Sequence, residues 1–147
     1  MLSEVLSKDK IIINPSVENW REAIKAAGNL LLADEIVTRE YVQAMITSVE
    51  EKGPYIVIAP GIAIAHARPE DGVNDLGMSL AILEKPIKFG NKDNDPVKIV
   101  FSFSSPDNKR HLEVFQQLTT LLMRDNFVEN ISKATTPEEV LDYIFEK

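Results

Sequence analysis

The order of hydrophobic patterns along the chain constrains the fold more than any other sequence feature. Two segments with helical spacing precede a series of short apolar runs, and helical spacing returns after residue 104. Strands gathered between amphipathic helices favour a sandwich in which the helices cover a sheet. No repeat, linker or low-complexity stretch divides the 147 residues. We therefore predict a single α/β domain over residues 1–147, with a mixed β-sheet of about five strands flanked by helices.

The predicted strands are short apolar runs bounded by Pro, Gly, Asn and Asp. They span residues 11–13, 55–59, 62–66, 77–83 and 97–103. Between the first two runs, apolar residues at helical spacing predict a helix over 17–32, with Ser16 as its candidate N-cap. A second predicted helix opens at Thr38 and stops at Gly53 and Pro54. Two helices therefore precede the main part of the sheet.

A third helix is predicted to begin near Pro106, because proline suits the first turn of a helix. Its apolar stripe is predicted to consist of Leu112, Phe115, Leu118, Leu121 and Leu122. A last helix is predicted from about residue 137.

Composition limits the chemistry and the partners of this chain. The absence of cysteine excludes disulfides, zinc thiolates and thiol nucleophiles, and it permits a reducing compartment. A net charge of −7 would repel nucleic acid and anionic membrane surfaces, so neither is an expected partner. The N-terminal residues lack the apolar core of a signal peptide, and no run of about 18 apolar residues occurs. We expect a cytoplasmic protein that does not enter the membrane.

His66 is the first candidate for chemistry, because it stands at the end of a predicted strand. Strand alternation would place Ile62, Ile64, His66 and Arg68 on one side and the alanines between them on the other. Pro69 then forces the chain to turn, which leaves the imidazole at an open rim. Imidazole is nucleophilic near neutral pH and is a good leaving group once phosphorylated, so His66 is the predicted phosphoryl acceptor.

Arg68 is a candidate phosphoryl contact, because strand alternation puts it on the side of His66. Its planar fork of donors suits phosphoryl oxygens. The alternative is an ordinary surface ion pair with Glu70 or Asp71, which is slightly favoured when Arg68 is considered alone.

His111 is the second histidine, and the sequence contains no other. It falls in the first turn of the third helix and shares a stripe with Phe115, Leu118 and Leu122, so its ring is predicted to point toward the sheet. A helix N-terminus attracts phosphate and disfavours imidazolium, so a neutral His111 could donate a hydrogen bond to a phosphoryl group or to His66. A satisfied core histidine is the alternative.

Motifs for other chemistries are missing from the sequence. It has no Gly-x-Ser-x-Gly elbow, no Walker A loop, no dinucleotide fingerprint and no His-Glu-x-x-His. His111 and Glu113 are two apart on a helix and would not face the same way, which makes a poor metal signal. We expect neither a metal nor a cofactor.

Residues 53–72 read GPYIVIAPGIAIAHARPEDG. This segment resembles the active-site segment of the mannitol/fructose-type enzyme IIA components (EIIA) of the bacterial phosphoenolpyruvate-dependent sugar phosphotransferase system (PTS). The resemblance extends over nearly the whole chain, including the two leading helices and the helix start near His111. The continuation ARPEDG is most similar to the ascorbate-type subgroup.

The resemblance implies a fold, an activity and a set of partners. The fold is the α/β sandwich of these components, and the activity is phosphotransferase activity through a phosphohistidine. Phospho-HPr would give its phosphoryl group to His66, which would pass it to a cysteine of a cognate EIIB that serves the membrane transporter EIIC. His111 matches the second active-site histidine, which assists the phosphoryl group without carrying it.

Two positions depart from the family pattern. Ala65 stands where the family usually has proline before its active histidine. The φ angle that a proline ring would fix at this position is therefore not fixed here. Mannitol-type members also carry an arginine late in the second helix, and residues 45–51 contain none. Arg68 is the candidate substitute.

Alternatives remain at the level of function. We expect an ascorbate-type system, and a pentitol, galactitol, fructose or mannitol is the alternative, because the sugar contacts reside in EIIC. The chain could instead be a stand-alone regulatory module that phosphorylation switches. A degenerate structural domain is the third alternative, and Ala65 and the missing arginine are its only support.

Overall fold

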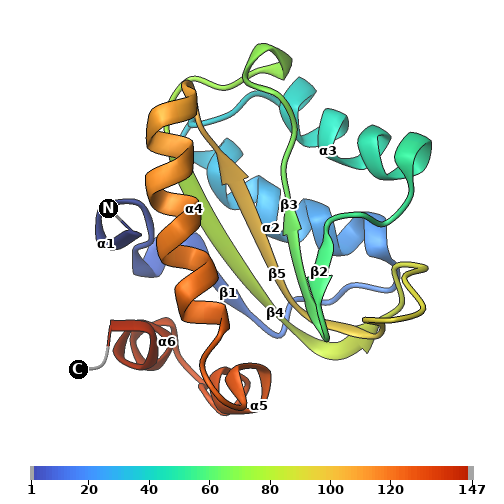
Figure 1. Cartoon of the computed structure of the whole chain (residues 1–147), viewed down its shortest axis with the longest axis vertical. Coiled ribbons are helices and arrows are strands. Elements are labelled where there is room, and N and C mark those ends of the chain that lie inside the picture. The colour runs from blue at the N-terminus through green and yellow to red at the C-terminus, as the bar shows by residue number, and fades with distance from the viewer. Residues whose placement is uncertain (1, 146–147) are drawn as a thin grey trace.

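The computed structural model describes residues 2–145, so residues 1, 146 and 147 of the predicted domain lie outside the described part. Within residues 2–145 five strands form one mixed sheet in the order β1-β4-β5-β3-β2 (Figure 1). The strands are β1 (Ile11–Ile13), β2 (Val57–Ala59), β3 (Ile62–Ala65), β4 (Gly77–Ile87) and β5 (Val97–Ser104). The predicted α/β sandwich with about five strands is confirmed.

The sheet is mixed because parallel and antiparallel pairs alternate across it. The pairs β1–β4 and β3–β5 are parallel, whereas β4–β5 and β2–β3 are antiparallel. The strand β3 therefore lies beside β5, far from it in sequence, and Ala65 pairs with Ser102. This register brings the chain after β3 next to the chain after β5.

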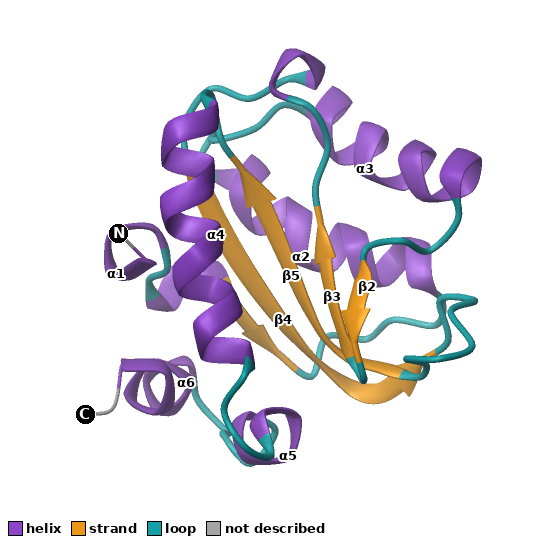
Figure 2. Cartoon of the chain, in the orientation of Figure 1, coloured by secondary structure: helices purple, strands orange, loops and turns teal. Residues whose placement is uncertain are grey.

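Helices cover both faces of the sheet (Figure 2). The helices are α1 (Leu2–Val5), α2 (Trp20–Ala33), α3 (Arg39–Lys52), α4 (Asn108–Leu122), α5 (Phe127–Ile131) and α6 (Pro137–Phe145). The apolar core on one face contains α2 and α3, and the core on the other contains α1, α4, α5 and α6. None of the helices in residues 2–145 is both long enough and apolar enough to cross a bilayer.

Alternation along β3 distributes its side chains between the two cores. Ala63 and Ala65 pack on the side of α2 and α3, whereas Ile62 and Ile64 pack on the side of α4. All four are buried, as expected for a central strand covered by helices on both faces. The alternation predicted for this segment is confirmed.

The second predicted helix is confirmed at both ends. Thr38 is the N-cap of α3, and its hydroxyl accepts the N–H of Tyr41. Gly53 ends the helix with φ 86°, a conformation that glycine adopts without strain. The last turn of α3 is therefore followed by a sharp change of direction.

Three details of the predicted helices are wrong. The N-cap of α2 is Asn19, not Ser16, because the Asn19 side chain accepts the N–H of Glu22 at 2.9 Å. In α4 the side chain of Leu112 is 61% exposed, and Val114 is buried in its place. The helix starts two residues later than predicted, at Asn108, and the burial of Val114 and Leu118 shows which face it turns to the sheet.

Candidate functional site

His66 follows the last residue of β3 and is half-buried. Its Nδ1 lies 2.9 Å from the carbonyl oxygen of Ile64. Because a carbonyl oxygen can only accept, Nδ1 must carry the proton, and the lone pair of the neutral ring is on Nε2. The backbone of the strand thus selects the tautomer of the imidazole.

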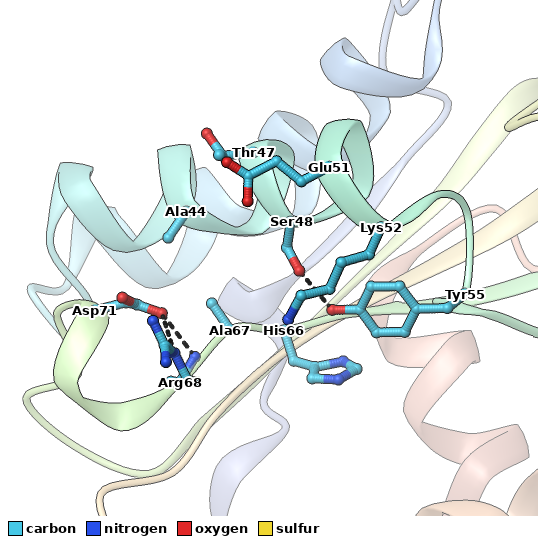
Figure 3. A pocket seen from close by; sticks show the side chains of 10 residues that line it. All are labelled: Ala44, Thr47, Ser48, Glu51, Lys52, Tyr55, His66, Ala67, Arg68 and Asp71. Carbon is cyan, nitrogen blue, oxygen red and sulfur yellow. Dashed lines mark hydrogen bonds and ion pairs between the residues drawn. The ribbon is translucent and has the colours of Figure 1, made fainter.

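Tyr55 packs against the imidazole of His66. The two rings meet edge to face, with centroids 5.7 Å apart and planes at 90°. The Tyr55 hydroxyl forms a 2.7 Å hydrogen bond with the Ser48 hydroxyl on α3 (Figure 3). The last turns of α3 therefore hold Tyr55, which in turn limits the orientation of the His66 ring.

Tyr41 connects the segment after β3 to the end of β5. Its hydroxyl donates to the carbonyl oxygen of Phe103 at 2.6 Å and accepts the N–H of Ala67 at 3.0 Å. The side chain is almost fully buried, and this burial raises the pKa of Tyr41 to about 12. The hydroxyl therefore stays protonated at neutral pH and fixes the backbone directly after His66.

His111 lies in the first turn of α4, where Asp107 is the N-cap. The imidazole stacks on Phe103 with centroids 4.9 Å apart and on Phe115 with centroids 5.5 Å apart. Burial lowers the pKa of His111 below its ordinary value, and the charge of His66 lowers it further. The ring is thus predominantly neutral near pH 7 and faces the sheet, as predicted.

The two histidines line one cavity of about 200 Å³. Tyr41 and Phe103 form part of its wall, and Asn108 stands at its rim. Asn108 is the first residue of α4, so its backbone N–H has no acceptor within the helix. His66 and His111 therefore lie at the same cavity, although they are 45 positions apart in the sequence.

A second cavity of about 400 Å³ opens on the side of His66 that faces α3. Its walls are Ala44, Thr47, Ser48, Glu51, Lys52, Tyr55, His66, Ala67, Arg68 and Asp71 (Figure 3). His66, Ala67 and Arg68 line both cavities. The imidazole of His66 therefore stands between two open spaces.

Arg68 lies at both cavities, and its side chain is 75% exposed. Its Nε is 3.6 Å from a carboxylate oxygen of Glu70 and 3.7 Å from one of Asp71. These are the surface ion pairs that the sequence also suggested. Both distances are longer than direct hydrogen bonds, so the guanidinium keeps donors for another anion.

Ala65, which stands in place of the usual proline, is fully buried within β3. Its pairing with Ser102 of β5 restricts the backbone before His66. The sheet therefore supplies part of the restraint that a proline ring would give.

Sequence reasoning missed Tyr41, Ser48, Lys52 and Tyr55 at this site. In the sequence Tyr41 fits an apolar position of the second predicted helix, and Tyr55 is the first residue of the strand predicted over 55–59. Residues 45–51 contain no cation, and Lys52 follows directly after them. The helix stop at Gly53 could have indicated these residues. A chain that reverses direction at Gly53 brings the residues on either side of it back toward the sheet.

No group of three or more His, Cys, Asp or Glu side chains in the described residues could hold a metal ion. A site with two histidines, nearby cations and the free N–H of Asn108 instead suits an anionic group such as a phosphoryl group.

Comparison with known families gives a match that spans the described site. The model of the family described as "Phosphoenolpyruvate-dependent sugar phosphotransferase system, EIIA 2" matches residues 4–147. The ascorbate-specific PTS system EIIA component of Escherichia coli (strain K12) is 40% identical over 145 residues, which cover 97% of this chain and 94% of the relative.

Solved structures give the same result. The mannitol-specific cryptic phosphotransferase enzyme IIA CmtB from Escherichia coli has a TM-score of 0.88 and 33% identity, with 99% of each chain covered. Mannitol IIA from Escherichia coli, solved in complex with phosphorylated enzyme IIB, has a TM-score of 0.83 and 26% identity, covering 97% of this chain and 98% of the other.

Proposed function

Because the chain belongs to the EIIA type 2 family of the phosphoenolpyruvate-dependent sugar phosphotransferase system, we propose that His66 accepts a phosphoryl group from phospho-HPr and passes it to a cysteine of a cognate EIIB. Members of this family are phosphotransferases that act through a phosphohistidine. We further propose that residues 1–147 make up one EIIA domain that works in the cytoplasm.

The hydrogen bond between His66 Nδ1 and Ile64 carries this proposal. It leaves the Nε2 lone pair free to attack phosphorus in line with the leaving group. The bond from phosphorus to the donor nitrogen breaks, its electron pair returns to the donor, and a phosphorus–Nε2 bond forms. In the second step a partner thiolate attacks phosphorus, and the electron pair of the phosphorus–Nε2 bond returns to His66.

His111 is the proposed hydrogen-bond donor to the phosphoryl group. Its lowered pKa keeps the ring neutral, so one ring nitrogen carries a proton that it can share with an equatorial oxygen. Stacking between Phe103 and Phe115 holds the ring in place before the phosphoryl group arrives. A donor that is positioned in advance costs little reorganisation during transfer.

Arg68 is the proposed third contact. Its guanidinium stands at both cavities and needs only to turn from Glu70 and Asp71 toward the phosphoryl oxygens. Because the side chain is exposed, water screens its charge, and we expect Arg68→Ala to lower the transfer rate by only a few-fold. An unchanged rate would remove Arg68 from the site.

The proposed partners follow from the composition of this chain and from its relatives. The chain contains no cysteine, so an acceptor thiol must come from another protein. The mannitol relative was solved with phosphorylated enzyme IIB. The 40% identity to an ascorbate-specific component supports an ascorbate-type system, in which EIIC makes the sugar contacts.

The experiment is intact-mass spectrometry after incubation with phosphoenolpyruvate, enzyme I and HPr. We expect wild type to gain one acid-labile phosphoryl group, His66→Ala to gain none, and His111→Ala to gain it slowly. A known EIIA component serves as the positive control. A stable phosphoryl group on His66→Ala would show that the acceptor is another residue.

A further inference from the structure

The α3 side of His66 offers open space and positive charge to a phosphoryl group. A phosphoryl group adds between one and two negative charges near pH 7. The cavity between His66 and α3 has about 400 Å³ of space, and its cationic side chains are Lys52 and Arg68. Lys52 and Arg68 are therefore the two candidate cations for a phosphoryl group that His66 would hold in this cavity.

Of these two cations, Lys52 is the one that forms no ion pair within the described residues. None of the ion pairs within residues 2–145 involves Lys52, whereas Arg68 is shared between two carboxylates. The Lys52 side chain runs from the end of α3 past Tyr55, with its ammonium toward His66 (Figure 3). The carboxylate of Glu51, which lines the same cavity, is turned toward Thr47 instead (Figure 3).

The backbone around Lys52 explains this direction. Lys52 is the last residue of α3, and Gly53 turns the chain away with φ 86°. Tyr55, two residues beyond, is hydrogen-bonded back to Ser48 of α3 and packs on His66. Lys52 thus projects from the end of α3, and Tyr55 of the turn that follows positions the imidazole of His66.

We propose that the ammonium group of Lys52 contacts the phosphoryl group on His66 and stabilises it from the α3 side, opposite His111. This inference rests on the proposed phosphoryl acceptance by His66. The ammonium supplies donors and a positive charge to the equatorial oxygens during in-line transfer, and it forms no covalent bond.

Lys52 also has an ordinary structural role, because a cation in the last turn opposes the helix dipole. That role affects the stability of α3 and does not depend on a phosphoryl group. A direct contact instead changes the rate of transfer and the lifetime of the phosphohistidine, and it weakens as salt screens the charge. These readouts separate the two roles.

The experiment compares wild type with Lys52→Gln, Lys52→Arg and Lys25→Gln. Lys25 lies on an exposed face of α2, so its substitution is a control with the same change in net charge. Each protein is phosphorylated with phosphoenolpyruvate, enzyme I and HPr, and intact mass gives the rate of acceptance. Removal of the donor proteins then gives the rate of phosphoryl loss, and thermal unfolding is measured alongside.

We expect Lys52→Gln to accept the phosphoryl group about fivefold more slowly than wild type at low salt, which is the upper end for an exposed charge-assisted contact. Lys52→Arg should stay within about threefold of wild type and Lys25→Gln within about twofold, because each keeps a cation at position 52. The deficit of Lys52→Gln should shrink at high salt.

A wild-type rate for Lys52→Gln would overturn the inference alone, provided that wild type is phosphorylated on His66. No phosphorylation of wild type would overturn the proposed function and this inference with it. Nuclear magnetic resonance of the lysine ammonium groups gives a test that needs no variant. Phosphorylation should shift the Nζ signal of Lys52 and leave that of Lys25 in place, and the absence of a shift at Lys52 would refute the contact.

Discussion

Replacing Tyr41 with phenylalanine removes one oxygen atom that joins the two halves of the site. The Tyr41 hydroxyl donates to Phe103 and accepts from Ala67, so the variant leaves one buried carbonyl and one partly buried N–H without this partner. The ring itself still fills its place in the core between α3 and the sheet. The change therefore tests the hydrogen bonds and not the packing.

The expected cost follows from the groups left unsatisfied. A buried donor or acceptor without a partner costs about 1–3 kcal/mol, and the Ala67 N–H is close enough to the surface to recover some of this from water. We expect Tyr41→Phe to lower the free energy of unfolding by about 2–3 kcal/mol. For a domain of this size, that corresponds to a decrease in Tm of roughly 5–12 °C.

The same substitution should affect transfer. Without the Tyr41 hydroxyl, the backbone after His66 is no longer tied to β5, where Phe103 supports the ring of His111. Small misplacements of reacting groups reduce rates strongly, so we expect phosphoryl acceptance to fall on the order of tenfold. Denaturant unfolding measures the first effect, and the mass-spectrometric time course measures the second.

Tyr143→Phe is the matched control. The ring of Tyr143 packs against Phe127, and its hydroxyl takes part in none of the hydrogen bonds found within residues 2–145. We expect that variant to stay within about 0.5 kcal/mol of wild type. If Tyr41→Phe is as stable and as active as Tyr143→Phe, the two hydrogen bonds do not hold the site as argued.

Three further predictions concern titration and backbone strain. The pKa of folded His111 lies below its ordinary value of 6.5, so the unfolded chain binds this proton more readily, and stability should fall as pH drops from about 7 through the folded pKa. Thermal unfolding of His111→Asn should lack this part of the pH dependence, and an identical pH profile would contradict the lowered pKa. The charge of His66 contributes to that lowering, so His66→Asn should raise the pKa of His111 in an NMR titration. Gly72 has φ 130°, and an added Cβ would overlap Thr38 Oγ1, the cap of α3, so Gly72→Ala should cost about 2–3 kcal/mol of unfolding free energy. Gly53→Ala is its control, because Gly53 also has positive φ but has open space around it, and equal costs would show that strain and not the overlap dominates.

Much of the active site follows from local patterns. Alternation along residues 62–67 places alanines on one side and isoleucines on the other, and it leaves His66 at the end of the strand. The helical spacing of His111 with Phe115 predicts that the imidazole faces the sheet, as observed. These predictions succeed because each depends on the geometry of one element.

The errors also have local causes. Asn19 displaced Ser16 as the cap because both residue types favour that position and the exact start of a helix depends on which side chain reaches a free N–H. Leu112 was assigned to the buried stripe because its hydrophobicity fits, yet the rotation of α4 against the sheet turns it to solvent. Hydrophobicity alone cannot distinguish neighbouring positions at the edge of a helical face.

The sequence by itself determined the order of the elements, the alternation in β3 and the two histidines at element ends, because helical and strand periods express local backbone geometry. Only the tertiary structure decided that β3 pairs with β5, which brings His66 to His111 and lets Tyr41 join Ala67 to Phe103. It also decided that Lys52 and His66 line the same cavity, while Arg68 meets Glu70 and Asp71. Strand order and the packing of α3 come from the burial of apolar surface across the whole chain, and no local spacing encodes them.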